Sequence, residues 1–157
     1  DISRLTLSTY LNALVDSYFV HRVPRFDVRG KLTLRNEEKY YLSDIGFRHH
    51  LVTTPVKDYG HLLENIVYLE LSRRYKKVCI GKNTQKEIDF VVQTNDGFAY
   101  YQVSQTVLDP KTLERELNAF SGLKDAHPRY LLTMDSLGKG RNFDGIKQLN
   151  LVQWLLN

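Results

Sequence analysis

Hydrophobic positions recur with a helical period at the start of the chain and again in its middle. The first set is Ile2, Leu5, Tyr10, Leu11, Leu14 and Val15. With Ser3 at the position of an N-cap, this spacing predicts a helix over residues 4–17. The second set is Tyr59, Leu62, Leu63, Ile66, Val67 and Leu71. This stripe predicts the longest helix of the chain, over 58–75, with its apolar side on a sheet.

Short runs of strand-forming residues, separated by polar corners, predict the sheet itself. The predicted strands are 18–25, 31–34, 39–42, 78–80, 87–92, 98–105, 129–134 and 145–149. Pro24 is expected to interrupt the first strand, and 27–30 to form a turn. The Asn95-Asp96-Gly97 sequence is expected to join strands 87–92 and 98–105 into a hairpin.

Capping residues predict three further helices. Ser43 and Asp44 resemble the cap of a short helix that runs to about Leu51. Asp109 followed by Pro110 predicts the start of a helix that reaches about Leu123. A terminal helix begins near Leu151, and residues 135–145 are expected to form a glycine-bearing loop.

A linker is predicted at residues 53–57, which contain Pro55, and it divides the chain into segments 1–52 and 58–157. The N-terminal segment is a helix followed by a hairpin. The C-terminal segment runs helix, three strands, helix, strand, and then a final strand and helix. This order predicts the mixed α/β class.

Composition limits the cellular environments in which the protein is expected to occur. The 157 residues are 42% hydrophobic, no run of about 18 apolar residues occurs, and no secretory signal precedes the first helix. Cys79 is the only cysteine, so no intramolecular disulfide is expected, and we interpret it as a small buried hydrophobe. These features predict a soluble cytoplasmic protein without a membrane partner. Because Asp1 leads directly into an amphipathic segment, we expect the chain to be a fragment of a larger protein.

Carboxylates in two predicted elements define the candidate chemistry. Glu64 borders the buried side of helix 58–75, where an unpaired charge is costly. Glu87 and Asp89 project from one face of their strand, and Ile88, Phe90 and Val92 from the other. The hairpin is expected to bring Asp89 close to Gln102 beneath that helix. Oxygen ligands that converge in this way suit Mg²⁺.

Several motifs, in a consistent order, resemble one known family. They are residues 59–65 (YGHLLEN), 87–92 (EIDFVV), 101–104 (YQVS), 109–116 (DPKTLERE) and 130–135. They resemble the uncharacterised C-terminal domain of prokaryotic AAA-type ATP-binding proteins, which is similar to PD-(D/E)XK nucleases. Residues 2–24 and 39–46 (KYYLSDIG) resemble the winged helix that precedes this domain. The resemblance implies a mixed-sheet, restriction-endonuclease-like domain over 58–157 and a partial winged helix over 1–52.

The resemblance also implies a degenerate catalytic site. In active nucleases of this type, a helix glutamate and two strand acids hold Mg²⁺, and a lysine two residues after the last acid orients the attacking water. Glu64 and Asp89 match the first two positions and are the candidate metal ligands. Gln102 and Ser104 stand where the third acid and the lysine are expected, so negative charge and ammonium are both lost. A migrated lysine, Lys86 or Lys82, is the alternative source of the ammonium.

We therefore expect a non-catalytic accessory domain that binds a partner or nucleic acid. Its first partner would be a missing N-terminal ATPase module, which would carry the ATP, because the chain has no GxxxxGK[ST] loop. One alternative is a Mg²⁺-dependent nuclease that acts on DNA or RNA. A second alternative is a winged-helix DNA-binding module that uses the outward face of the first helix. The residues of that face are Arg4, Ser8, Thr9 and Asn12, with Asp16 as an acid among them.

Zinc is not expected. The chain's histidines are His21, His49, His50, His61 and His127. The adjacent pair would point about 100° apart on a helix, and the others are scattered. The net charge of +4 and a pI near 9.1 permit nucleic-acid contact without requiring it.

Overall fold

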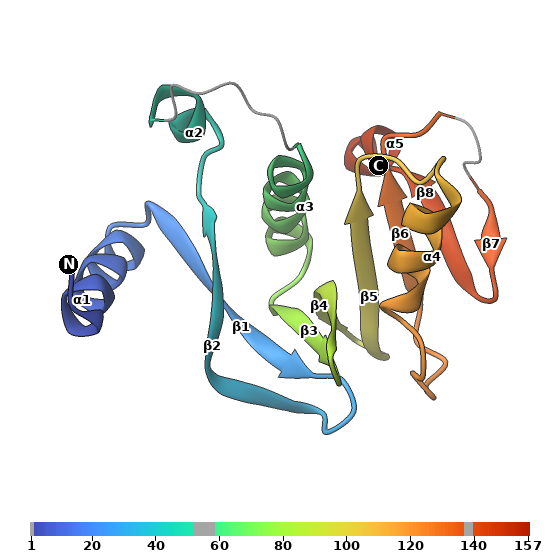
Figure 1. Ribbon diagram of the computed structural model, residues 1–157, viewed down its shortest axis with the longest axis horizontal. Helices are drawn as coiled ribbons and strands as arrows, with labels where there is room; N and C mark the ends of the chain where they lie inside the picture. The colour runs from blue at the N-terminus through green and yellow to red at the C-terminus, as the bar shows by residue number, and fades with distance from the viewer. Residues whose placement is uncertain (1, 52–58, 137–139) are drawn as a thin grey trace.

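A computed structural model describes residues 2–51, 59–136 and 140–157. In these ranges, eight strands form one mixed sheet in the order β2-β1-β3-β4-β5-β6-β8-β7 (Figure 1). The strands are β1 Val20–Asp27, β2 Leu32–Leu42, β3 Val78–Asn83, β4 Lys86–Thr94, β5 Gly97–Ser104, β6 Arg129–Thr133, β7 Asn142–Phe143 and β8 Ile146–Asn150. The helices are α1 Arg4–Asp16, α2 Gly46–Leu51, α3 Gly60–Arg74, α4 Pro110–Asn118 and α5 Leu151–Leu156. The predicted α/β class with a mixed sheet is confirmed.

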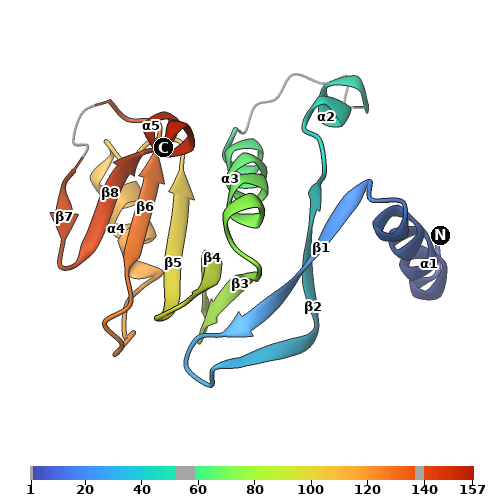
Figure 2. The ribbon, with the colours of Figure 1, turned by 180° about the vertical axis from the view of Figure 1, so that it is seen from behind.

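Helices cover both faces of this sheet. On one face, α3 and α5 pack over a cluster that contains Phe90, Tyr101 and Leu132. On the other face, α4 packs over a cluster that contains Ile88, Tyr100 and Leu131. Figure 2 shows α4 behind the sheet when α3 is in front. The molecule therefore has three layers with a core on each side of the sheet.

The N-terminal hairpin is part of the same sheet. β1 pairs antiparallel with β2 and, from Arg25 to Asp27, parallel with residues 80–82 of β3. The backbone N–H of Val28 extends this contact by donating to the carbonyl of Lys82 at 3.1 Å. The expected linker at 53–57 lies outside the described residues. The strands β1 and β3, which come before and after this segment in the sequence, nevertheless pair directly.

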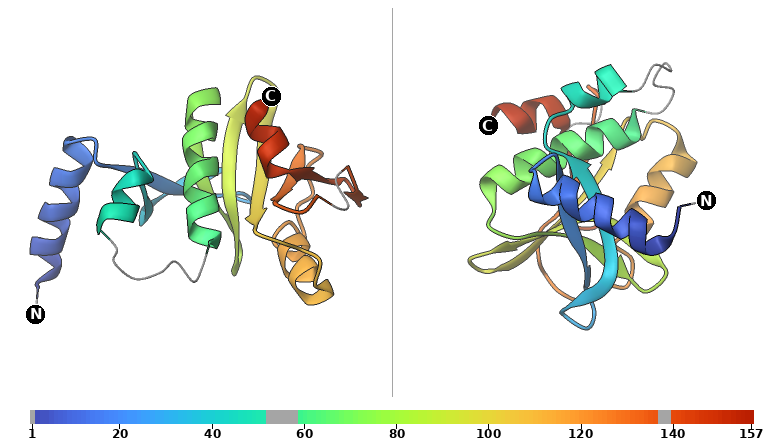
Figure 3. Two further views of the ribbon diagram at one scale, coloured as in Figure 1. Left: turned by 90° about the horizontal axis from the view of Figure 1, so that it is seen from above. Right: turned by 90° about the vertical axis from the view of Figure 1, so that its left-hand side faces the viewer.

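Helix α1 stands away from the sheet at one end of the molecule (Figure 3). Its N-cap is Ser3, whose side chain accepts a hydrogen bond from the backbone of Thr6, as the sequence predicted. None of its side chains is buried, and Leu5 and Tyr10 of its apolar stripe are 79% and 59% exposed. None of the helices in the described ranges has the length and apolar character that crossing a membrane requires.

Several predicted boundaries are wrong, each for a local reason. Pro24 does not interrupt β1, because it lies before the residues that pair with β3 and next to an irregularity in the register with β2. The pieces predicted at 31–34 and 39–42 belong to the single strand β2. Helix α4 ends at Asn118, five residues earlier than expected, because the backbone then turns through i+3 hydrogen bonds. The strand β7 lies within the stretch that was expected to be a loop.

A bulge in β4 overturns one prediction about side-chain direction. Gly81 of β3 pairs with Ile88, but Cys79, two residues earlier, pairs with Val91, so β4 carries one extra residue. Ile88 consequently packs on the α4 face and Phe90 on the α3 face. The expectation that Ile88, Phe90 and Val92 share a face is therefore wrong. Bulges of this kind change the direction of the side chains that follow them, and here Asp89 lies within the bulge.

Candidate functional site

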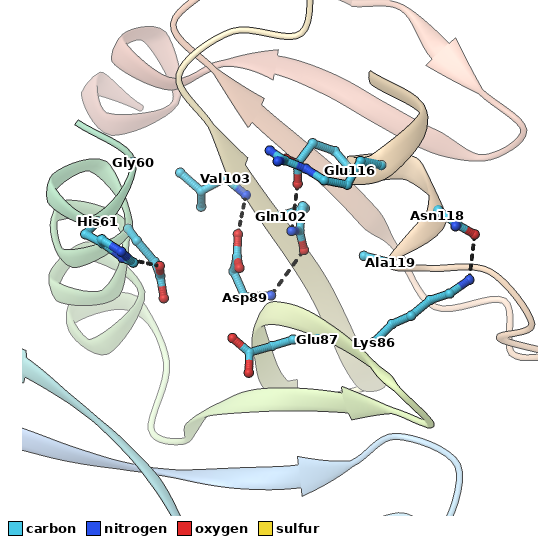
Figure 4. A pocket seen from close by; sticks show the side chains of 12 residues that line it. Gly60, His61, Lys86, Glu87, Asp89, Gln102, Val103, Glu116, Asn118 and Ala119 are labelled. Atoms are coloured by element: carbon cyan, nitrogen blue, oxygen red, sulfur yellow. Dashed lines mark hydrogen bonds and ion pairs between the residues drawn. The ribbon is translucent and has the colours of Figure 1, made fainter. Parts of the chain in front are cut away.

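A polar cavity of about 500 Å³ lies where β4 and β5 separate (Figure 4). The two strands pair only from Phe90 and Tyr101 toward their shared turn. Beyond that point they diverge, and the space between them is flanked by the first turns of α3 on one side and by the end of α4 on the other. The cavity is lined by Gly60, His61, Glu64, Lys86, Glu87, Asp89, Gln102, Val103, Arg115, Glu116, Asn118 and Ala119.

Asp89 and Gln102 lie side by side at the fork, as the hairpin prediction required. The backbone N–H of Asp89 donates to Oε1 of Gln102 at 3.2 Å. In return, Oδ2 of Asp89 accepts the backbone N–H of Val103 at 2.8 Å. Burial, and then the nearby charge of Glu64, raise the pKa of Asp89 well above its ordinary value. This carboxyl therefore favours its neutral form.

Glu64, on α3, lines the same cavity, as expected. It is 9% exposed, and its Oε1 accepts hydrogen bonds from Lys39 Nζ at 2.9 Å and from the hydroxyl of Tyr41. The ring of Tyr41 is fixed by stacking on Tyr68, with ring centroids 4.6 Å apart. On the solvent side, Nδ1 of His61 is 3.7 Å from Oε2 of Glu64. Both oxygens of this carboxylate thus have nearby cationic or hydrogen-bonding groups.

Glu87, at the start of β4, shares the ammonium of Lys39. Lys39 Nζ is 2.6 Å from Oε1 of Glu87, and the guanidinium of Arg25 binds Oε2 of the same carboxylate. Burial alone would raise the pKa of Glu87, but the hydrogen bonds from Lys39 and Arg25 outweigh it and hold this pKa below its ordinary value. For Lys39, burial acts to lower the pKa, but the two carboxylates outweigh it and raise the pKa. The pair is therefore ionised at neutral pH.

Glu116, on α4, is a further carboxylate of the cavity that was not predicted from the sequence. It is 5% exposed, and its Oε2 accepts a hydrogen bond from Nε2 of Gln102 at 2.8 Å. Its other oxygen binds its neighbour Arg115 at 2.6 Å. A signal was available, because Leu113, Leu117 and Phe120 surround Glu116 at helical spacing and place it on the buried side of α4.

Of the three remaining candidates from the nuclease pattern, Ser104, Lys86 and Lys82, only Lys86 is among the described residues that line the cavity. Ser104 is not among the described residues that line the cavity, and its hydroxyl donates to the carbonyl of Thr106 at 3.0 Å. Lys86 lines the cavity, but its ammonium binds Asn118 Oδ1 at 2.6 Å and Ser121 Oγ at 2.8 Å. Lys82 lies opposite Glu87 in the β3–β4 register and is not among those lining residues.

The candidate DNA-contacting residues all lie on α1, away from the cavity. Arg4 and Ser8 are exposed. The hydroxyl of Thr9 donates to the carbonyl of Leu5 at 3.0 Å, within the helix. Oδ1 of Asn12 accepts a hydrogen bond from Arg22 on the neighbouring hairpin. Two of the four side chains therefore already have intramolecular partners.

The residues of the cavity do not fit a Mg²⁺ ion. Magnesium binds oxygen ligands at about 2.0–2.1 Å in near-octahedral geometry, usually one or two carboxylates together with several waters. Here Oε1 of Glu64 holds the ammonium of Lys39, and Oε1 of Gln102 accepts a backbone N–H. Within the described ranges, no three His, Cys, Asp or Glu side chains are placed so that they could hold one ion. Glu64 and Asp89 as metal ligands remain a prediction from the sequence.

Fold and site together define a three-layered α/β protein with a charged cavity at a fork in its central sheet. Residues 1–58 match a family model described as a domain of unknown function (DUF8612). An uncharacterized protein of Haemophilus influenzae is 34% identical over 154 residues, which are 98% of this chain. The chain spans only 38% of the length of that relative. No solved structure matches the chain.

Proposed function

We propose that the chain is a non-catalytic accessory domain of a longer protein, with a degenerate nuclease-like site. The observation that carries this proposal is that the side chains that nuclease catalysis would need are paired with other groups of the protein. Gln102 is held between Asp89 and Glu116, Ser104 is bound to a backbone carbonyl, and Glu64 is neutralised by Lys39. A group held in this way is not free to take a substrate or to activate water.

The contacts of Gln102 support the proposal that a glutamine fits this position of the nuclease pattern better than an acid would. Its amide donates to the buried carboxylate of Glu116 at 2.8 Å. A glutamate in place of this glutamine would set two carboxylates against each other in a partly desolvated place, which is unfavourable. Gln102 and Glu116 therefore form a compatible pair, whereas the acid of the catalytic pattern would conflict with Glu116.

The proposal extends to the architecture and to the larger protein. From α3 to β6 the chain runs helix, three strands, helix, strand, which supports a restriction-endonuclease-like domain. The helix α1 followed by the β1–β2 hairpin supports a partial winged helix. The chain spans only 38% of the Haemophilus relative, so that relative is long enough to hold a further module such as an AAA-type ATPase. Reading the preceding sequence for a phosphate-binding loop tests this part, and the absence of such a loop would refute it.

The proposed accessory role is to bind a partner or nucleic acid at the rim of the cavity. The side chains of His61 and Arg115 are 77% and 74% exposed there, and the chain is basic overall. Fluorescence anisotropy with labelled single- and double-stranded DNA and RNA, over a salt series, tests the nucleic-acid form of this role. Loss of binding in Arg115→Ala, but not in the matched control Lys111→Ala on the exposed part of α4, is the expected result if nucleic acid binds here.

A direct assay separates this proposal from the nuclease alternative. The purified chain is incubated with plasmid DNA and with RNA in Mg²⁺ and in Mn²⁺, beside the variant Asp89→Asn. We expect no cleavage above the level of the variant. Cleavage that disappears in Asp89→Asn would replace the proposal with a metal-dependent nuclease.

Two observations favour the alternative that the chain is a Mg²⁺-dependent nuclease. Lys86 and Glu116 line the same cavity as Asp89, so an ammonium and an additional carboxylate are present, although on other elements than the family pattern requires. If cleavage is found, Lys86→Met and Glu116→Gln identify whether these two groups replace Ser104 and Gln102. Equal loss in both variants would establish them in those roles.

A further inference from the structure

Three side chains from the N-terminal hairpin reach the carboxylates at the fork. Arg25 lies on β1, and Lys39 and Tyr41 lie on β2, within residues 1–58, which match the family model described as a domain of unknown function. The parallel pairing of β1 with β3 places the hairpin one strand away from β4, near whose start Glu87 lies. The charge around these carboxylates is therefore set jointly by residues of the N-terminal hairpin and by residues of α3 and β4.

Lys39 is the central member of this set. Its ammonium lies 2.9 Å from Glu64 and 2.6 Å from Glu87, so it bridges carboxylates from α3 and β4. The lysine side chain is 27% exposed and the Glu64 side chain 12%, so solvent screens this contact only in part. Tyr41 adds a hydroxyl on the same oxygen of Glu64. A positive charge between two carboxylates is the arrangement that a bound cation would also produce.

We propose that the ammonium of Lys39 is a built-in cation for two carboxylates that line the cavity, and that it takes the place between Glu64 and Glu87 that a divalent metal ion would otherwise take. This inference rests on the proposed non-catalytic role of the domain. It explains why the residues present do not fit Mg²⁺ even though several carboxylates open into one cavity. The charge that an ion would bring from solution is instead attached to the chain.

Competition between the two cations follows from their geometry. A divalent ion placed between Glu64 and Glu87 would lie about 2.0–2.5 Å from their oxygens. That is the space in which Nζ of Lys39 lies between Oε1 of Glu64 and Oε1 of Glu87. The ammonium would then lie within a few ångströms of the ion, and the two like charges would repel each other. Metal can enter the position between Glu64 and Glu87 only if the lysine leaves it, and the lysine is held there by both carboxylates.

The test uses Mn²⁺ as the probe ion and thermal unfolding as the measurement. In the wild-type chain, millimolar MnCl₂ is expected to leave Tm unchanged relative to EDTA. In Lys39→Met, which keeps the aliphatic length and removes the charge, Tm is expected to fall by about 5 °C in EDTA. Addition of MnCl₂ is then expected to recover most of this loss, because the ion binds only the folded state.

Two further variants locate the effect. The Mn²⁺ response of Lys39→Met is expected to disappear when Glu64→Gln is added to it. The matched control is Lys86→Met, which removes a lysine from the same cavity whose partners are Asn118 and Ser121 rather than carboxylates. This control is expected to gain no Mn²⁺ response. A folded Lys39→Met that Mn²⁺ does not stabilise would overturn the proposal.

If Lys39→Met fails to fold, a direct measurement of Mn²⁺ binding to the wild-type chain still tests the proposal. Isothermal titration of the wild-type chain with MnCl₂ is expected to show no site that depends on Glu64, and binding that is abolished by Glu64→Gln would refute the inference. Binding without cleavage would leave the proposed non-catalytic function standing. Cleavage that persists in EDTA would instead refute that function and leave the role of Lys39 intact.

Discussion

The side-chain amide of Asn65 pairs with the backbone of Leu42 through two hydrogen bonds of 2.9 Å, one in each direction. The residue before it, Glu64, binds Lys39 and Tyr41 of the same strand, β2. Two successive residues of α3 thus attach the helix to the N-terminal hairpin. The position of the Glu64 carboxylate is consequently tied to the position of β2.

Replacement of Asn65 tests this attachment. Asn65→Ala leaves the N–H and the carbonyl of Leu42 without their partners, and the site is only 8% exposed. We expect the free energy of unfolding to fall by about 1–3 kcal/mol. Urea unfolding followed by circular dichroism measures the change. The control Glu114→Ala, at an exposed position on α4, should stay within about 0.5 kcal/mol of the wild type.

Asp89→Asn should stabilise the protein at neutral pH. The raised pKa of Asp89, caused by burial and by Glu64, means that its ionised form is unfavourable in the folded state. The amide removes this cost and can still accept the backbone N–H of Val103. We expect the free energy of unfolding to rise by about 1 kcal/mol. The converse change, Gln102→Glu, adds a charge beside Glu116 and should lower it; a stabilising Gln102→Glu would contradict this account.

Gly81→Ala should destabilise the bulge between β3 and β4. A Cβ atom at this position would lie 2.7 Å from Cγ2 of Val91 and 2.9 Å from Cβ of Ile88. Both neighbours belong to a buried cluster, so relief requires the strands to move apart. The expected cost is about 1–3 kcal/mol by urea unfolding. Lys77→Ala, at an exposed site just before β3, serves as the control, and equal costs in the two variants would argue against this packing.

Acid should remove the contribution of Glu70 to stability. Hydrogen bonds from Arg73, opposed by burial and aided by Arg74, lower the pKa of Glu70 from 4.5 to about 2. Because the folded pKa is lower than the unfolded one, the stabilisation is present above about pH 4.5 and is lost as the pH falls toward 2. Glu70→Gln should therefore be less stable than the wild type at neutral pH and equally stable near pH 2. A constant difference across this range would show that the ion pair is not the cause.

Arg4→Ala tests the DNA-binding alternative for α1. The outward face of α1 contains one basic residue among the candidate contacts, and Thr9 and Asn12 already have partners within the protein. We expect the affinity for a labelled duplex, measured by anisotropy over a salt series, to be the same in Arg4→Ala and in the wild type. A steep salt dependence that weakens in the variant would instead favour a winged-helix reader.

Local signals in the sequence predicted much of this fold correctly. The caps at Ser3 and Asp109 begin helices, and the two-residue turn at Asn95 and Asp96 joins β4 to β5. That turn sets the register that brings Asp89 next to Gln102. Each of these features depends on residues close together in the chain.

The parts that could not be predicted depend on contacts between distant residues. Lys39 reaches Glu87 because β1 pairs with β3, more than 50 residues later, and nothing local indicates this pairing. The bulge in β4 is set by its partner strand, so strict alternation placed Ile88 on the wrong face. Glu116 was within reach of the sequence, because a carboxylate in an otherwise apolar helical stripe indicates a buried partner.

The fork between β4 and β5 makes the hollow a property of the backbone. Its walls come from two strands that part after Phe90 and Tyr101 and from the flanking helices α3 and α4, so its position is set by the course of the backbone. Acidic, amide or lysine side chains can therefore replace one another there while the backbone around the cavity keeps its course. A protein of this design can lose one chemistry and still offer a cavity in which another can be built.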